Sequence, residues 1–198
     1  MGGMAELVQE GKTCFISLSE CSAGSLGHGS VVHPLVSLQM VYLLFSRDAE
    51  EHRQIDACKE LGITMTAYAV FGRGMLSAKC PRWKKCQSTT FAPICLAFHT
   101  ANVENNLRLR PALKAVALRK NATLVQLAIA CPMAEGLRAN ALIVPIPGAK
   151  SRKHLEENVR VADIVLTADN LAEIDRIAPY GAASGTRYPI EQLHRLNR

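Results

Sequence analysis

Several common functional signatures are missing from this 198-residue chain, and each absence excludes a class of protein. Neither G-x-G-x-x-G nor the P-loop pattern occurs, which excludes a Rossmann dinucleotide fold and a P-loop NTPase. No block of five like charges and no aromatic-basic platform is present, which disfavours nucleic-acid binding. The longest apolar runs, such as residues 35–45, are interrupted and too short to span a membrane.

The cysteines also lack the spacing of a metal site or a disulfide framework. There are seven of them, an odd number, with no C-x-x-C pair. This pattern favours free thiols in a reducing compartment. The first twelve residues contain two acids and no apolar signal segment, so we expect a soluble, cytoplasmic protein without a metal.

The composition is that of a globular protein. Hydrophobic residues make up 48% of the chain and charged residues 20%, which is consistent with one domain over residues 1–198. The net charge of +6 suits an anionic partner such as nucleic acid, a membrane surface or a phosphorylated small molecule. The basic residues are densest at 82–85, 108–110 and 150–154.

Strand-like and helix-like segments alternate along the chain. We expect residues 22–30 to be a loop or a poorly formed helix, residues 72–105 to be a long excursion with little regular structure, and the tail 178–198 to be irregular. The apolar pattern and the capping residues predict strands at 12–19, 36–42, 63–68 and 140–146, and helices at 4–11, 47–61, 110–120, 123–135, 153–161 and 167–177.

This alternation predicts an α/β fold with a parallel sheet. The continuous apolar run A-L-I-V-P-I at 141–146 favours a sheet covered on both faces. Four βα units of a barrel and a small doubly wound sheet both fit the pattern. In either fold, binding residues lie at the carboxyl ends of the strands.

The most informative strand end is followed by I-P-G-A-K-S-R-K-H-L-E-E-N, residues 146–158. Gly148 permits a tight turn, and a basic cluster stands where a helix N-terminus offers free N–H groups to an anion. Charge alone supports two interpretations equally: a phosphate site, or a solvated helix start that carries several basic residues.

Six ordered motifs resemble the carboxyl-terminal half of aldo-keto reductases. They stand almost end to end at residues 4–12 (M-A-E-L-V-Q-E-G-K), 16–20 (I-S-L-S-E), 38–48 (L-Q-M-V-Y-L-L-F-S-R-D), 57–63 (A-C-K-E-L-G-I), 67–74 (A-Y-A-V-F-G-R-G) and 146–158. The resemblance implies a partial (β/α)8 TIM barrel, roughly strands 5 to 8 with their helices. It also implies NADP(H) as cofactor and an aldehyde or ketone as the small-molecule substrate.

The resemblance also implies roles for twelve residues. Ser19 and Gln39 would hydrogen-bond the nicotinamide carboxamide, Tyr68 would stack on its ring, and Phe71, Gly72 and Gly74 match the loop over the pyrophosphate. Lys150, Ser151, Arg152 and His154 match the segment that takes the adenosine 2′-phosphate, and Glu157 and Asn158 match the adenine contacts. Ala69 stands where the family offers a hydroxyl to the cofactor phosphates.

The Asp, Tyr, Lys and His that catalyse the family reaction lie in the other half of the barrel, and no residue here matches them. We therefore expect a truncated family member that is inactive alone. The alternative is a non-catalytic nucleotide-binding remnant or a regulatory partner of a full-length reductase. Half a closed barrel would expose sheet edges, through which the chain would self-associate.

Overall fold

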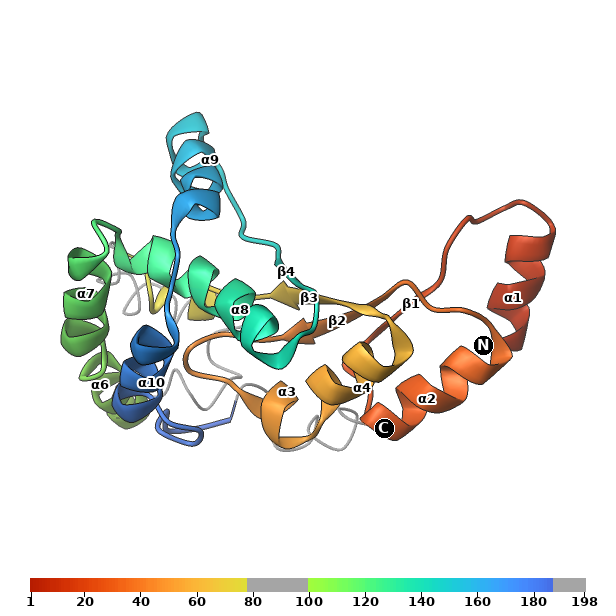
Figure 1. The fold of residues 1–198 in the computed structure, drawn as a ribbon, viewed down its shortest axis with the longest axis horizontal. Helices are drawn as coiled ribbons and strands as arrows, with labels where there is room; N and C mark the ends of the chain where they lie inside the picture. Colours follow the sequence, from red (N-terminus) through yellow and green to blue (C-terminus); the bar gives the residue numbers. More distant parts are fainter. Residues whose placement is uncertain (78–99, 187–198) are drawn as a thin grey trace.

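The computed structural model describes residues 1–77 and 100–186 (Figure 1). Their central element is a sheet of four parallel strands in the order β1-β2-β3-β4, the same as their order in the chain. A doubly wound sheet reverses its strand order at a switch point, and the described strands show no such reversal. The strands are β1 (Ser17–Ser19), β2 (Ser37–Val41), β3 (Thr64–Tyr68) and β4 (Ile143–Pro145).

The two faces of the sheet differ in burial. Alternate residues such as Leu38, Met40 and Met65 are completely buried and form one core cluster with residues of the helices. The residues between them, such as Gln39 and Thr66, are only half-buried. Side chains alternate between the faces of a strand, so helices cover one face and leave the other more open.

The prediction of a sheet covered on both faces is therefore wrong for the described residues. Leu142, Val144 and Ile146 alternate with the buried Ile143, and they are 64%, 42% and 44% exposed. The run around β4 is continuously apolar because both faces of the strand carry apolar side chains, but only the face with Ile143 is buried. The open face also carries Ser17, Ser19, Ser37, Gln39, Thr64 and Thr66.

Helices connect the strands and pack mainly on the covered face. Helix α4 contacts β3, α8 contacts β4, and α2 lies beside α4 (Figure 1). Gly136 on α8 allows the close approach to β4, because a Cβ atom there would lie 2.8 Å from the carbonyl oxygen of Ala141. The helices are α1 (Gly2–Gln9), α2 (Ala23–Val32), α3 (Asp48–Glu51), α4 (Gln54–Leu61), α6 (Thr100–Leu107), α7 (Arg110–Arg119), α8 (Leu124–Ala139), α9 (Arg152–Val159) and α10 (Ala168–Ile177), with 3₁₀ turns at Gly72–Gly74 and Arg160–Asp163.

Three helical segments differ from the sequence-based predictions. The glycine-rich stretch expected as a loop or poorly formed helix is a ten-residue helix, α2, which Ser22 caps by accepting from Ser25 N at 3.1 Å. The single helix expected at 47–61 is two helices, because Arg53 adopts a left-handed conformation with φ of 61°. Helix α6 occupies part of the excursion predicted at 72–105, and the rest of that segment from 78 to 99 lies outside the described residues.

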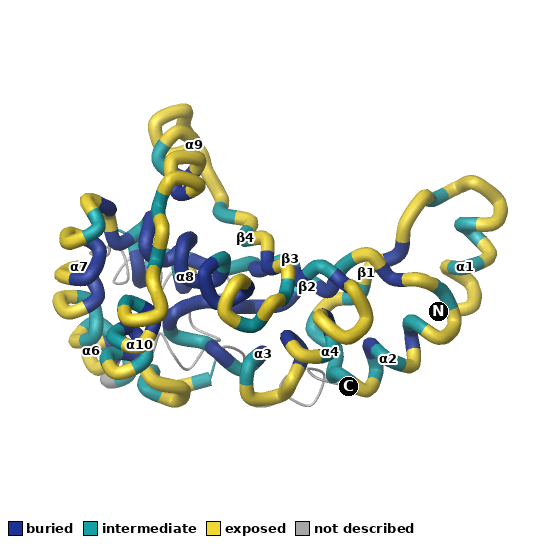
Figure 2. Tube along the Cα trace, in the orientation of Figure 1, coloured by how far each residue is buried: buried dark blue, intermediate teal, exposed yellow. Residues whose placement is uncertain are grey.

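A second core cluster joins α7, α8 and α10, beside the end of β2. Helix α8 begins with a capping box between Thr123 and Gln126 and continues as one helix past Pro132. Figure 2 shows that α8 is mostly buried, whereas α1 projects at one end of the molecule and α9 projects from its upper side, both with exposed surfaces. No helix within 1–77 or 100–186 is both long and apolar enough to cross a membrane.

An ion cluster centred on the buried side chains of Arg47 and Glu135 ties α3, α8 and α10 together. The guanidinium of Arg47 contacts Glu50 at 2.6 Å, Asp175 at 2.5 Å and Glu135 at 3.4 Å. Arg138 contacts Glu135 at 2.6 Å and Asp175 at 2.8 Å. Two guanidiniums thus face three carboxylates, and the cluster connects residues more than a hundred positions apart in the chain.

Candidate functional site

The ends of β1 and β2 place two predicted residues side by side. Ser19 pairs with Gln39 across the strands, and the Ser19 hydroxyl donates to the backbone oxygen of Gln39 at 3.2 Å. Thr66 on β3 continues the same row. Ser19 is exposed and Gln39 half-buried, so a hydroxyl and an amide lie together on the open face.

Glu20 is a rim residue to which the sequence motifs gave no role. It has a left-handed conformation with φ of 52°, and its Oε1 accepts from Val41 N at 2.7 Å. The carboxylate therefore bridges the ends of β1 and β2 just beyond the pair of Ser19 and Gln39. An acid directly after a strand end is the signal in the sequence that points to it.

Tyr68, the last residue of β3, leads into a turn with an unusual backbone. Ala69, Gly72, Arg73 and Gly74 all have positive φ, at 58°, 55°, 51° and 102°. Hydrogen bonds hold this turn closed, from Gly72 N to Ala69 O at 2.8 Å and from Gly74 N to Phe71 O at 3.0 Å. Glycine adopts such conformations readily, whereas Ala69 and Arg73 do so at a cost in free energy.

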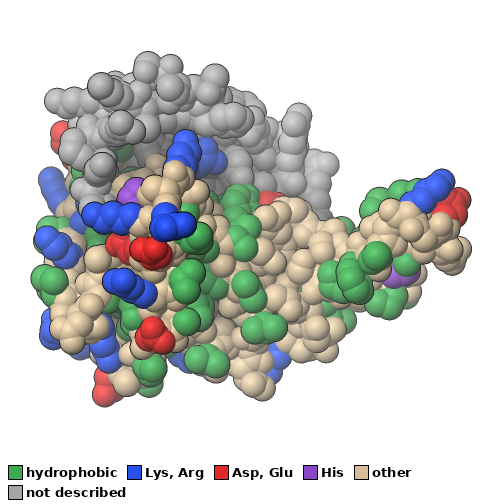
Figure 3. All heavy atoms as spheres, turned by 90° about the horizontal axis from the view of Figure 1, so that it is seen from above, with side chains coloured by type: hydrophobic (Ala, Val, Ile, Leu, Met, Phe, Trp, Pro, Cys, Tyr) green, Lys and Arg blue, Asp and Glu red, His purple; other side chains and the backbone are tan. Residues whose placement is uncertain are grey.

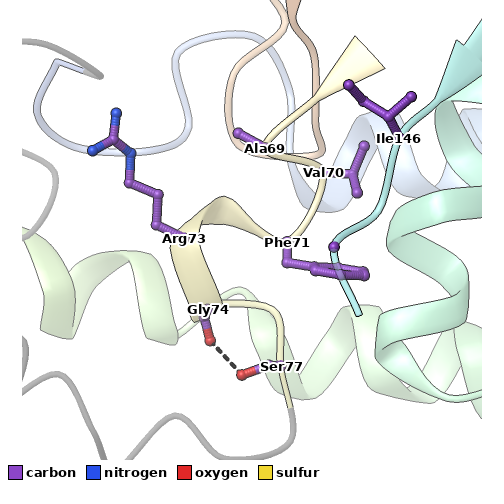
Figure 4. Close-up of a pocket in the computed structure, with 8 residues that line it drawn as sticks. Ala69, Val70, Phe71, Arg73, Gly74, Ser77 and Ile146 are labelled. Carbon is purple, nitrogen blue, oxygen red and sulfur yellow. Dashed lines mark hydrogen bonds between the residues drawn. The ribbon is translucent and has the colours of Figure 1, made fainter. Parts of the chain in front are cut away.

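This turn forms one wall of a cavity of about 260 Å³ (Figure 4). The predicted residues Phe71 and Gly74 line it, and Ile146 and Gly148 line it from the segment after β4. The two predicted segments, 67–74 and 146–158, therefore meet in space. The predicted Gly72 is buried and does not line the cavity; a Cβ atom there would lie 3.2 Å from the Leu43 side chain.

Ser77 also lines the cavity, and the motifs did not single it out. The side chain of Ser77 donates to Gly74 O at 2.8 Å, and Arg110 on α7 donates to Ser77 O at 2.8 Å. This chain of contacts fixes the turn against α7. Val70 and Ala69 complete the wall of the cavity, and Arg73 lines it with its guanidinium pointing away from Phe71 and Ile146 (Figure 4).

The basic cluster stands at the N-terminus of α9. Ser151 caps the helix by accepting from His154 N at 3.3 Å, and its neighbours Lys150, Arg152 and His154 are exposed. Lys and Arg side chains gather on this side of the molecule around α9 (Figure 3). Positive side chains and a helix N-terminus are therefore open to a solution anion.

The other end of α9 is tied to the start of α8. Glu157 accepts from the Thr123 hydroxyl at 2.8 Å, and the Gln126 side chain donates to Glu157 O at 3.1 Å. Asn158 is only 8% exposed, and its Nδ2 atom has no hydrogen-bond partner among the described residues. A buried amide donor without a partner is a group that a ligand could satisfy.

Metal and thiolate chemistry find little support in the described residues. No group of three or more His, Cys, Asp or Glu side chains there is arranged to hold a metal ion. Burial raises the pKa of the Cys21 thiol beside Glu20, and it raises the pKa of Cys58 to about 12. Both cysteines therefore remain protonated and weakly nucleophilic at neutral pH.

Comparison with known proteins decides the family. The Aldo/keto reductase family model matches residues 1–179. The chain belongs to the aldo/keto reductase family. It is 35% identical over 189 residues to aldo-keto reductase str7 of Strobilurus tenacellus, an alignment that covers 94% of this chain and 55% of that protein.

Solved aldo-keto reductases have a similar fold. The glycerol dehydrogenase AKR11B4 of Gluconobacter oxydans superposes with a TM-score of 0.74 at 21% identity, over 89% of this chain and 52% of that one. The thermostable aldo-keto reductase Tm1743, in complex with the inhibitor epalrestat, gives 0.65 at 23% identity, over 88% and 52%. This aldo-keto reductase chain thus spans about half the length of the relatives it matches.

Proposed function

We propose that the chain provides the NADP(H)-binding half of an aldo-keto reductase, corresponding to strands 5 to 8 of a (β/α)8 barrel. The intact enzyme would reduce an aldehyde or ketone with NADPH. One observation carries the proposal: the turn after β3 and the segment after β4 meet around one cavity, and that segment runs directly into the exposed basic start of α9. A long, phosphorylated ligand could make contacts along this whole path.

The described residues fit the nicotinamide end of such a cofactor. The amide of Gln39 and the hydroxyl of Ser19 lie together on the open face and can bond a carboxamide, which both donates and accepts. Tyr68 ends the neighbouring strand and offers an aromatic face for stacking. When bound, the cofactor would supply the hydride.

The rim fits the phosphate and adenine end. Arg73 at the cavity offers positive charge to a pyrophosphate, with Phe71, Gly72 and Gly74 shaping the turn. Lys150, Ser151, Arg152 and His154 would hold a 2′-phosphate at the N-terminus of α9, and this favours NADP over NAD. Glu157 and the buried amide of Asn158 would contact the adenine.

We propose none of the described tyrosines as the proton donor for carbonyl reduction. Tyr42 donates to Glu50 at 2.7 Å, and burial raises its pKa far above the ordinary value. Tyr180 lies at the surface with its hydroxyl 3.4 Å from Asp48. We therefore propose that the 198 residues bind NADP(H) without reducing carbonyls by themselves, which also allows a non-catalytic, regulatory role beside a full-length reductase.

A fluorescence titration of the purified chain with NADPH and NADH tests this proposal. We expect NADPH to bind at least tenfold more tightly, because the 2′-phosphate adds charge-assisted hydrogen bonds at α9. The variant Lys150→Ala/Arg152→Ala should lose this preference while NADH binding changes little. Lys114→Ala/Lys120→Ala, which removes two positive charges from the region of α7, is the matched control and should keep it.

Three results would contradict the proposal. Equal affinity for the two nucleotides would remove the role given to the basic start of α9, and absence of any binding would remove the cofactor site. NADPH oxidation by the chain alone with a panel of aldehydes and ketones, above the buffer rate, would show that a proton donor is present after all.

A further inference from the structure

The sheet has two outer edges, β1 and β4, and neither is paired within residues 1–77 and 100–186. Each edge strand is three residues long. An unpaired edge exposes a row of backbone donors and acceptors that a further strand can use. The two edges lie on opposite sides of the same open face, so one partner could bridge them.

The backbone groups of β1 that face outward can be assigned from its bonds to β2. Ile16 O accepts from Val36 N, and Glu20 N donates to Gln39 O, so the even-numbered residues use their backbone groups toward β2. Because residues of a parallel strand alternate between its two neighbours, the N–H groups of Ser17 and Ser19 point to the free edge. The β1 edge therefore presents two hydrogen-bond donors.

The same reasoning assigns the free edge of β4. Leu142 O accepts from Met65 N and Ile146 N donates to Ala67 O, so these residues face β3. Ile143 and Pro145 then point outward, and their two carbonyls are acceptors two residues apart. Pro145 has no N–H to offer, so two β4 edges pair poorly with each other, whereas β1 supplies the matching donors.

Apolar side chains on the open face flank both edges. Phe15, two residues before β1, is 71% exposed, and Leu142, Val144 and Ile146 along β4 are 64%, 42% and 44% exposed. A parallel pairing of Ser17 with Val144 keeps all of these side chains on the same face of an extended sheet. Closure of β1 onto a β4 strand would therefore bury them together.

We propose that a second copy of this chain covers the open face. A twofold axis along the strands lets β1 of each copy pair with β4 of the other, which gives eight parallel strands in a closed ring with no free edge. The size agrees, since one chain covers 52% of the glycerol dehydrogenase AKR11B4. This dimer rests on the sheet edges and not on the nucleotide, so it can hold or fail independently of NADP(H) binding.

Size-exclusion chromatography with light scattering tests the dimer on the full chain. We expect twice the 21.5 kDa of one chain. Leu142→Asp/Val144→Asp should raise the dimer dissociation constant at least tenfold and give monomer, because it places charges in the junction. These side chains are exposed in a single chain, so circular dichroism should show an unchanged fold.

A matched control places the same charges elsewhere. Leu118→Asp/Val165→Asp changes two side chains that are 61% and 74% exposed on other surfaces, and it should leave the dimer intact. Hydrogen exchange gives a second measurement: the amides of Ser17 and Ser19 should exchange at least tenfold more slowly in the wild type than in the β4 variant.

Three outcomes would overturn the proposal. The first is a wild-type chain that stays monomeric at the concentrations used for the other assays. The second is a dimer that the β4 variant does not weaken, since the contact would then lie on another surface. The third is a monomer that associates only with a polypeptide carrying the rest of a reductase barrel, which would make that polypeptide the occupant of the open face.

Discussion

Glu135 gives the sharpest stability prediction, because its carboxylate is buried in the ion cluster of α3, α8 and α10. The side chain is 4% exposed and lies between Arg138 at 2.6 Å and Arg47 at 3.4 Å. Burial, with a further contribution from the nearby Glu50, raises the pKa of Glu135 from 4.5 to about 7 despite the two guanidiniums. The third carboxylate, Asp175, keeps both arginines engaged, and its own pKa is lowered.

The sign of the pH effect follows from this raised pKa. The folded state binds a proton at Glu135 more tightly than the unfolded state does, so this group stabilises the fold most below pH 4.5. The contribution is lost as the pH rises through about 7. At about 1.4 kcal/mol per pKa unit the shift corresponds to at most ~3.5 kcal/mol, and we expect about 2 kcal/mol because Arg138 is partly exposed and brings solvent to the cluster.

Glu135→Gln removes this titration while keeping the size of the side chain. Urea unfolding of the variant and the wild type should be compared between pH 5 and pH 8. The variant should gain about 2 kcal/mol relative to the wild type over this range. Other ionisable groups are common to both proteins, so their contribution cancels in the difference.

The matched control is Glu173→Gln on α10, which removes a more exposed carboxylate paired with Arg119 and should leave the pH dependence of the wild type unchanged. Parallel pH profiles for wild type and Glu135→Gln would refute the reasoning, because they would show that Glu135 titrates alike in the folded and unfolded chain.

Two further changes test local backbone features. Ala69→Gly should raise the free energy of unfolding by about 0.5–1 kcal/mol, because it relieves the strain of an alanine with positive φ. Ala57→Gly inside α4 should instead lower the free energy of unfolding. A loss of stability in both variants would contradict the strain at Ala69. Thr123→Ala should lower the free energy of unfolding in urea by about 1 kcal/mol, because it removes the cap of α8 and the hydrogen bond to Glu157. Thr123→Ser keeps the hydroxyl, so its loss of stability should be less than half as large. Equal losses would show that the cap is not the cause.

Local signals in the sequence predicted those elements whose ends carry a specific residue type. Thr123 and Thr167 begin α8 and α10 with capping boxes, and Gly62 ends α4 in the left-handed conformation that glycine favours. Helix α2 was missed because its glycines and serines suggest a loop, while its apolar residues rest on tertiary contacts such as the complete burial of Leu26. The break at Arg53 was missed because nothing in its residue type favours positive φ.

The candidate site was predictable where a motif follows a strand, and not where contacts are distant in the chain. The motifs indicated both segments that meet at the cavity, 67–74 and 146–158, although the role of each residue stays a prediction. They gave no sign that Arg110 would anchor Ser77, or that Arg47 would reach Asp175 across 128 positions. Such pairings depend on how helices pack, which no local pattern encodes.

The structural cost of a departure from the family pattern depends on where the changed residue packs. Leu38 and Met65 on the covered face are fully buried, so replacing either with a smaller residue would cost core packing. Ala69 and Phe71 line the cavity and also pack against core residues, so a change at either one affects both what the cavity can hold and the packing of the core. Val70 is 1% exposed and lines the cavity as well, so residues of the core form part of the cavity wall, and the packing that fixes the fold also shapes the cavity.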